Sequence, residues 1–298
     1  MFKNIFKIIK YDVNTQIVIF NKIKITFKNN AMKKILKDIE KENNFEDYKK
    51  RNVDITQVPQ AKGILREKQL KCLEILKKVA NICDENNINY WLAFGTLLGA
   101  YRHKGFIPWD DDIDLDMERS DYEKIYPILK EALKDDKEWN VREFFNRDFQ
   151  IRVYNTKNEH IGLDIFPMDE IYIDNSDEKS LNSLNKLVHK AFNAFDKIGK
   201  KYTSATSREE ANKDALKITN DIVKTHSSNN ENATKILFYG VDFHHPMDKC
   251  CQLYDDIFPL TTIKFEDEEF KCPKNYLKVL EDEFGDYMSY PKKFKYIL

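Results

Sequence analysis

An acidic run at positions 108–117 constrains this chain more than any other feature. It reads PWDDDIDLDM and follows the segment WLAFGTLLGAYRHKGFI. If the run forms a strand, its alternate residues point to one face. That face then carries four carboxylates, those of Asp110, Asp112, Asp114 and Asp116. Like charges in such a row repel one another, so the run predicts a positive partner, for which a divalent metal with bound phosphate is the usual solution.

The overall charge of the chain is balanced. Among 298 residues there are 49 Lys and Arg and 50 Asp and Glu, which gives a formal net charge of -1. This balance argues against a general nucleic-acid-binding protein, because such proteins carry a basic excess. The hydrophobic fraction of 42% is enough to build a sizeable core in one large domain or two ordinary ones.

The five cysteines do not suggest a disulfide framework. Their number is odd and the sequence has no Cys-x-x-Cys pair, which favours a reducing cytosol. A zinc site remains an alternative, although its residues match no standard finger spacing. Its ligands would come from Cys250, Cys251, Cys272, His244 and His245.

The first 40 residues differ from the rest of the chain because lysines alternate with apolar residues. Nine lysines fall in this segment, and Asp12 is the only acid before Asp38. Two interpretations stay open, a basic amphipathic segment on an anionic membrane surface and an N-terminal hairpin packed on the core. Residues 16–27 include a strand-like alternation, and the polar residues 41–62 resemble a linker. We expect no secretory signal and no membrane span, since no run approaches about 18 apolar residues.

Hydrophobic periodicity predicts alternating helices and strands from residue 66 onward. A helix with an apolar stripe at Leu65, Leu70, Leu73, Leu76, Val79 and Ile82 should cover 66–85. A strand at 88–94, a Gly95-Thr96 turn and a short helix at 97–101 should precede the acidic strand, which begins at Pro108. Further elements are expected as a helix at 120–133 capped by Ser120 or Asp121, strands at 139–145, 149–154 and 161–166, helices within 177–225, short strands within 257–271 and a helix at 275–284.

These elements can assemble a site for phosphoryl transfer. A glycine at Gly95-Thr96 allows close approach of a phosphate, and the next helix directs its free N–H groups there. The acidic strand supplies Asp112 and Asp114, and the segment GLDIF supplies Asp164 between apolar neighbours. Three carboxylates with such a turn can hold two metal ions for in-line displacement, and one carboxylate can accept the hydroxyl proton.

The same residues carry a close resemblance to the LicD family. The family signature appears as GTLLG at 95–99, Arg102-His103 and IPWDDDID at 107–114, and its later blocks resemble 162–169 and 284–291. The resemblance implies an α/β (α+β) fold with a nucleotidyltransferase-like core, a small mixed sheet flanked by helices. It also implies Mg²⁺ or Mn²⁺ at Asp112, Asp114 and Asp164, and transfer of a phospho-alcohol from a CDP-activated donor, of which CDP-choline is the best known, to a sugar of a surface glycan.

Four further residues are expected to bind substrate. Arg102 and His103 follow the phosphate turn, Arg152 lies in a strand before Asp164 and can bind a diphosphate, and Trp109 can contact a cationic head group. Each also has a structural interpretation, as a surface or a core residue. The resemblance divides the chain into a basic N-terminal extension at 1–60, the catalytic core at 61–175, a helical insertion at 176–235 and a C-terminal part at 236–298 that packs on the core.

Other classes of function remain open. A metal-dependent glycosyltransferase also uses an Asp-x-Asp pair, with a nucleotide-sugar. A calcium-binding loop would place Asp110, Asp112 and Asp114 at positions 1, 3 and 5, but Leu115 then replaces the glycine of position 6. A membrane-surface scaffold could use the basic N-terminus alone. We expect a cytoplasmic enzyme, peripheral at the inner membrane face if residues 1–40 contact lipid, with a glycan acceptor that can be lipid-linked.

Overall fold

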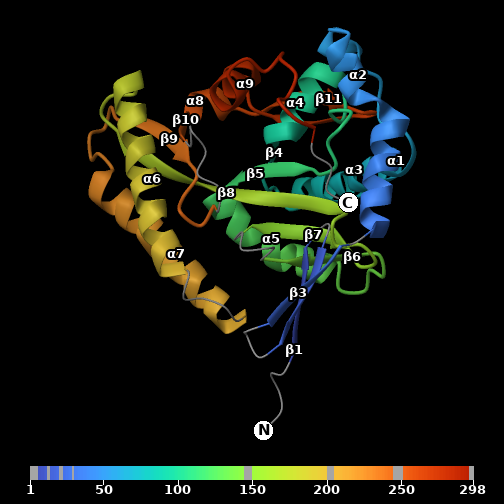
Figure 1. Cartoon of the computed structure of the whole chain (residues 1–298). Helices are drawn as coiled ribbons and strands as arrows, with labels where there is room; N and C mark the ends of the chain where they lie inside the picture. The colour runs from blue at the N-terminus through green and yellow to red at the C-terminus, as the bar shows by residue number, and fades with distance from the viewer. Residues whose placement is uncertain are drawn as a thin grey trace.

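The computed structural model describes residues 6–11, 14–19, 23–28, 30–143, 150–199, 205–243 and 251–294 of the chain. Its centre is a mixed seven-stranded sheet with the order β10-β9-β8-β5-β4, to which β6 and β7 are added beside β8 (Figure 1). The strands are β4 Trp91–Leu92, β5 Asp114–Glu118, β6 Trp139–Arg142, β7 Ile151–Asn155, β8 Gly162–Ile173, β9 Thr234–Phe238 and β10 Cys251–Leu253. This mixed α/β architecture confirms the predicted fold class.

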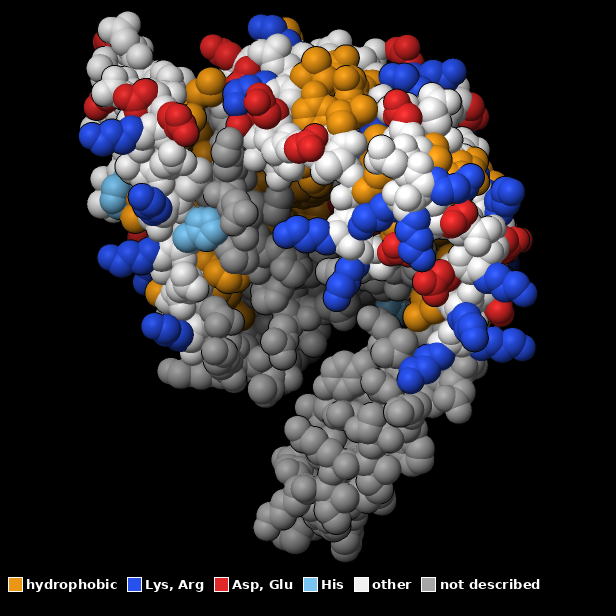
Figure 2. Space-filling view, turned by 45° about the horizontal axis from the view of Figure 1, so that its top comes forward, with side chains coloured by type: hydrophobic (Ala, Val, Ile, Leu, Met, Phe, Trp, Pro, Cys, Tyr) orange, Lys and Arg blue, Asp and Glu red, His pale blue; other side chains and the backbone are white. Residues whose placement is uncertain are grey.

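Helices surround the sheet (Figure 1). They are α1 Asn30–Asn43, α2 Phe45–Lys50, the 3-10 helix η1 Ile55–Gln57, α3 Gly63–Glu85, α4 Phe94–His103, α5 Arg119–Ala132, α6 Glu178–Gly199, α7 Ala205–His226, α8 Tyr254–Ile257 and α9 Tyr276–Phe284. A separate antiparallel hairpin joins β11 Thr261–Phe265 to β12 Glu268–Cys272. In Figure 2 acidic and basic side chains are interspersed over the surface, as the near-zero net charge of the sequence leads one to expect.

The pairing of β5 with β8 organises the middle of the sheet. These two strands are parallel, whereas β8 pairs antiparallel with both β7 and β9. In the parallel register Asp114 lies opposite Asp164. Two acidic residues from segments 50 positions apart in the sequence are thereby brought side by side near the start of both strands.

The long helix α3 packs one apolar face on the sheet. Leu65, Cys72, Leu76, Val79 and Cys83 are all fully buried on this face. Burial of such a side chain stabilises a fold by roughly 1.5–3 kcal/mol, so the helix anchors the layer. The predicted stripe was wrong at one position, because Leu70 is 47% exposed.

The segment predicted as a linker is part of the folded core. Phe45 of α2, Ile55 of η1 and Val58 are buried in the main hydrophobic cluster. Its composition is polar, and these three side chains are buried while others, such as Pro59, stay exposed. The linker prediction for 41–62 was therefore wrong, since three apolar anchors are enough to fix an otherwise polar segment to the core.

The N-terminal strands form a small sheet of their own. Strands β1 Phe6–Tyr11, β2 Asn14–Ile19 and β3 Ile23–Lys28 pair antiparallel in sequence order. The alternating segment 16–27 is therefore split between β2 and β3. Within the described residues, no helix combines the length and the apolar character that crossing a membrane would require.

The chain between β8 and β9 forms the predicted helical region. Helices α6 and α7 lie side by side at one edge of the central sheet (Figure 1). They share a small apolar cluster made by Phe195, Ala211, Ala215 and Val241. The helices predicted within 177–225 are thus confirmed, and they pack on each other and on the sheet.

Candidate active site

The acidic run does not form one continuous strand. Strand β5 begins at Asp114, and residues 110–113 belong to the loop that leads from α4 into it. In that loop, ligand oxygens of Asp110, Asp111 and Asp112 all lie within 4.8 Å of one another. The prediction that the strand starts at Pro108 was wrong, and the alternation argument applies only to Asp114 and Asp116.

The carboxylates of this loop and of the two strands form one electrostatic cluster. Burial raises the pKa of Asp110 and that of Asp114 well above the usual value, and the neighbouring charge of Asp112 raises both further. Burial also raises the pKa of Asp164 to about 6, with Asp112 again contributing. A cluster of this kind favours a bound cation, because removing the charges from water is otherwise costly.

The two carboxylate oxygens of Asp164 differ, because only one of them has a hydrogen-bond partner among the described residues. Its Oδ2 accepts a hydrogen bond of 2.5 Å from Nη1 of Arg152, and both side chains are buried. Arg152 also donates through Nε and Nη2 to the carbonyl oxygen of Glu159, at 3.2 and 3.1 Å. Oδ1 of Asp164 is buried and has no hydrogen-bond partner in the part of the chain that the structure describes. Arg152, predicted to bind a diphosphate, is thus placed as the partner of this carboxylate.

Asp116 points to a different environment from Asp114. Its Oδ2 accepts a hydrogen bond of 2.5 Å from the hydroxyl of Tyr239, and the residue is 1% exposed. Burial raises the pKa of Asp116 to about 7, while the hydrogen bonds of Tyr239 and Trp91 oppose that rise. The four carboxylates expected on one face are therefore divided. Asp110, Asp112 and Asp114 interact with one another, whereas Asp116 pairs with Tyr239.

Gly95 and Thr96 lie in the first turn of α4 and not in a turn before it. The helix begins at Phe94, whose φ of 44° is unusual for a residue with a side chain. A Cβ on Gly95 would approach Oδ2 of Asp110 to 2.4 Å, so only glycine leaves room for that carboxylate. The hydroxyl oxygen of Thr96 accepts a hydrogen bond of 2.9 Å from the N–H of Asp114. Both residues therefore contact the acidic cluster, which the positive end of the helix stabilises.

Arg102, His103 and Trp109 lie together near the loop carboxylate of Asp110. Burial lowers the pKa of Arg102 to about 10, and the neighbouring charge of Asp110 opposes this shift. Nε of Arg102 donates to Nε2 of His103 at 3.0 Å, and its Nη1 donates to the carbonyl oxygen of Tyr287 at 2.8 Å. Its guanidinium also lies 5.5 Å from the ring centroid of Trp109. Trp109 packs in turn on Phe45, Tyr290 and Phe294. The structure thus uses this group to attach the C-terminal segment to α4.

The partly buried imidazole of His103 predicts a dependence of stability on pH. Burial, with the neighbouring charge of Arg102, lowers the pKa of His103 from 6.5 to about 3. Between these values the unfolded chain binds a proton that the folded chain does not, so stability falls as the pH drops below 6.5. The loss is at most about 1.4 kcal/mol per pH unit.

Urea unfolding of the wild type and of His103→Gln at pH 7 and pH 5 measures this effect. The stability advantage of the wild type over the variant should shrink, or reverse, at pH 5. An advantage that is unchanged between the two pH values, or an NMR titration of His103 near pH 6.5, would show that the ring is not held neutral.

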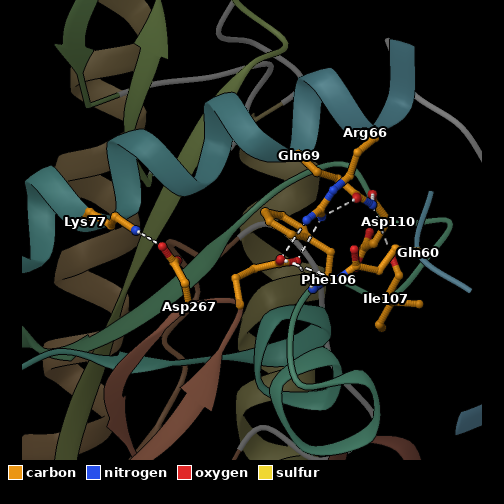
Figure 3. Close-up of polar contacts among 9 residues, drawn as sticks. Gln60, Arg66, Gln69, Lys77, Phe106, Ile107, Asp110 and Asp267 are labelled. Carbon is orange, nitrogen blue, oxygen red and sulfur yellow. Dashed lines mark hydrogen bonds and ion pairs between the residues drawn. The ribbon is translucent and has the colours of Figure 1, made fainter. Parts of the chain in front are cut away.

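Two polar residues of α3 belong to the site and were missed by sequence reasoning. Nζ of Lys68 forms a buried 2.5 Å ion pair with Oδ2 of Asp111. Nε2 of Gln69 donates to the carbonyl oxygen of Asp110 at 2.8 Å, and Gln69 is fully buried (Figure 3). A signal was present, because these positions fall on the buried face between Leu65 and Cys72. Polar side chains in an apolar stripe require partners.

Other predictions concern residues outside the cluster. Helix α5 begins after Glu118, so neither Ser120 nor Asp121 is its N-cap, and Asp121 instead accepts a hydrogen bond from the N–H of Asn89. Cys251 and Cys272 are buried free thiols. The other ligands of the zinc alternative, at positions 244, 245 and 250, lie outside the described residues.

Residues 87–183 match the family model described as LicD/FKTN/FKRP, nucleotidyltransferase domain. The match contains α4, β5 and β8, and hence all of the carboxylates described above. The match and the mixed α/β fold place a nucleotidyltransferase domain of the LicD type at residues 87–183. This finding confirms the resemblance that the sequence carries.

Several characterised and uncharacterised proteins are similar to parts of the chain. The lipopolysaccharide cholinephosphotransferase LicD of Haemophilus influenzae is 53% identical over 64 residues, 22% of this chain and 24% of that protein. The mouse ribitol 5-phosphate transferase FKRP is 31% identical over 103 residues, 32% of this chain and 21% of that protein. A protein of Rickettsia typhi is 31% identical over 148 residues, 46% of each chain. The matched segments thus span less than half of each relative.

Proposed function

We propose that this chain transfers phosphocholine from a CDP-activated donor to a sugar hydroxyl of a cell-surface glycan. The observation that carries the proposal is the meeting of Asp112, Asp114 and Asp164 inside the LicD-type domain. Two similar proteins support it, since their names describe transfer of choline phosphate and of ribitol 5-phosphate.

The residues present suit a hard divalent cation such as Mg²⁺ or Mn²⁺. Carboxylate oxygens are the ligands that these ions prefer. Among the described residues no donor reaches the buried Oδ1 of Asp164, which suits a ligand atom. Asp112, Asp114 and Asp164 would hold the cation, which would neutralise phosphate charge and stabilise the leaving group.

The chain itself supplies orientation and proton acceptance. Thr96 fixes the backbone of Asp114, Arg152 fixes the carboxylate of Asp164, and Lys68 fixes that of Asp111. Side chains held in this way keep their geometry while the substrate binds. One of the carboxylates of the cluster can also accept the proton of the attacking hydroxyl.

The location of the enzyme is also a proposal. The nine lysines of the first 40 residues, interleaved with apolar residues, support contact with an anionic membrane surface on the cytoplasmic side. Such contact would bring the enzyme close to a lipid-linked acceptor.

A nucleotide-sugar is the alternative donor, because glycosyltransferases use similar acidic pairs.

A thermal-shift series on the full chain tests the proposed donor. CDP-choline, CDP-ethanolamine, CDP-glycerol, CDP-ribitol and UDP-glucose are compared with and without Mg²⁺. At a hundredfold excess over Kd, a ligand adds about 2.7 kcal/mol, which raises Tm by roughly 5 °C. We expect the largest rise with CDP-choline and only with Mg²⁺. A larger rise in Tm with another CDP-alcohol would identify that compound as the donor in place of CDP-choline. A rise with UDP-glucose alone would favour the glycosyltransferase. No rise with any compound would contradict the proposal.

A further inference from the structure

The β11–β12 hairpin reaches the acidic loop through one residue of its turn, Glu266. Its carboxylate receives two hydrogen bonds from Arg66 of α3, Nη1 to Oε1 at 2.9 Å and Nη2 to Oε2 at 2.7 Å (Figure 3). Oε1 also accepts the backbone N–H of Phe106 at 3.2 Å. The side chain is only 8% exposed although it belongs to a surface hairpin. A bidentate pair of this kind fixes orientation as well as distance.

Arg66 is also linked to the carboxylate loop, through hydrogen bonds of Gln69. Nη1 of Arg66 lies 3.2 Å from Oε1 of Gln69, which accepts its hydrogen bond. The amide nitrogen of Gln69 donates to the carbonyl oxygens of Asp110 and Ile107, at 2.8 and 3.3 Å (Figure 3). A continuous series of hydrogen bonds therefore leads from the hairpin to the backbone of Asp110.

Residues 104–106, which precede the acidic loop, pack closely against Glu266. The backbone N–H of Glu266 donates to the carbonyl oxygen of Lys104 at 2.7 Å. A Cβ on Gly105 would lie 2.5 Å from Oε1 of Glu266, so this position needs glycine. Glu266 itself has a φ of 58°, in the left-handed region that is costly for a residue with a side chain. Phe265 and Glu268 are joined by a two-residue loop, a class of turn that uses such a positive φ, so the hairpin turn itself accounts for the conformation of Glu266.

We propose that Glu266, Arg66 and Gln69 are positioning residues for the carboxylate site. They touch neither substrate nor cation. They set the path of residues 105–110, and with it the place of the Asp110, Asp111 and Asp112 carboxylates. The inference rests on the proposed function, because the residues position ligands of its cation. Partners behind metal ligands commonly change metal affinity or activity by 10–100-fold when they are replaced.

The hairpin also provides a matched control. Asp267, the next residue, forms a 2.8 Å ion pair with Lys77, which lies on the same helix as Arg66 (Figure 3). Neither residue of this second pair contacts the acidic loop in any hydrogen bond of the described chain. Glu266→Gln and Asp267→Asn therefore remove the same charge from the same turn, and only the first loosens the link to Asp110.

The test compares Mn²⁺ affinity, measured by electron paramagnetic resonance well below Tm, and the Mg²⁺ concentration that gives half-maximal turnover of CDP-choline. Glu266→Gln should weaken Mn²⁺ binding and raise the Mg²⁺ requirement by about tenfold or more. Arg66→Lys keeps the charge without the planar fork, so its effect should lie in the same direction. The double variant Arg66→Gln/Glu266→Gln should be no worse than the single ones, since both break one link. Asp267→Asn should behave as the wild type.

The outcomes separate this inference from the proposed function. Wild-type Mn²⁺ affinity in Glu266→Gln, or equal losses in Glu266→Gln and Asp267→Asn, would overturn the positioning role even if the wild type transfers phosphocholine. A wild type that binds Mn²⁺ more tightly than Glu266→Gln but turns over no CDP-alcohol would support the positioning role and contradict the proposed function. A wild type that binds no Mn²⁺ would overturn the inference, because no cation site would then exist to be positioned.

Discussion

Replacing Asp112 or Asp114 with asparagine is expected to abolish transfer while the chain stays folded. The loss should reach about a thousandfold or more, because in phosphoryl transfer the cation and the positioning of phosphate supply most of the rate. Folding should not suffer, because each carboxylate lies in a cluster whose charges repel. The charges of Asp112 and Asp164 both raise the pKa of Asp114. Removing one charge relieves this repulsion, so Tm should equal or exceed that of the wild type when no divalent cation is added.

Release of CMP from CDP-choline and a melting curve for each variant measure the two parts of this prediction. Glu118→Gln serves as the control, since it removes a carboxylate from the same strand. Its side chain pairs with Lys235 at 3.2 Å and not with the acidic cluster. The control should retain turnover. Turnover within about tenfold of the wild type in both Asp112→Asn and Asp114→Asn would mean that this pair does not hold the reacting phosphate.

Replacing Arg119 with methionine is expected to destabilise the fold by about 3–5 kcal/mol. Arg119 donates to both carboxylate oxygens of Asp169, at 2.9 and 2.7 Å, and to Oδ2 of Asp242 at 2.7 Å. Both acids are buried. Methionine keeps much of the volume of the side chain but leaves two carboxylates in the interior without a cation. The loss of stability comes from leaving two buried carboxylates without a counter-charge. This cost is larger than the net stabilisation that the ion pairs provide.

Equilibrium unfolding in urea at pH 7 gives the free energy of unfolding for this comparison. Arg51→Met is the control, because Arg51 pairs with Asp47 at 3.2 Å while both side chains remain about 60% exposed. Exposed pairs contribute roughly 0–1 kcal/mol, so the control should hardly change stability. A loss below about 1 kcal/mol for Arg119→Met would show that Asp169 and Asp242 find other partners or take up protons in the folded chain.

Local periodicity was sufficient for the elements that form from their own sequence. Helix α3 was expected at 66–85 and covers Gly63–Glu85, and α9 was expected at 275–284 and covers Tyr276–Phe284. Strand β9, which no pattern predicted, depends on pairing with β8 and β10 on either side. A short apolar segment such as TKILF carries too little periodicity to show that it joins a sheet.

Some contacts of the candidate site could be predicted from the sequence, and others could not. The proximity of Asp114 and Asp164 could be anticipated, because both begin strands of one sheet. The contact of Gln69 with Asp110 joins residues 41 positions apart, and that of Arg66 with Glu266 joins residues 200 positions apart. No spacing rule connects such residues, so the polar positions in α3 signal only that partners exist. Which partners they find depends on how helix, loop and hairpin pack in three dimensions.

Calorimetric titration of the full chain with CDP-choline tests the central claim most directly. We expect the donor to bind when Mg²⁺ is present, and binding to be lost on chelation or in an Asp112→Asn/Asp114→Asn variant that melts at or above the wild-type temperature. Binding of equal affinity without Mg²⁺, or in that folded variant, would contradict the claim that these carboxylates bind the donor through a divalent cation.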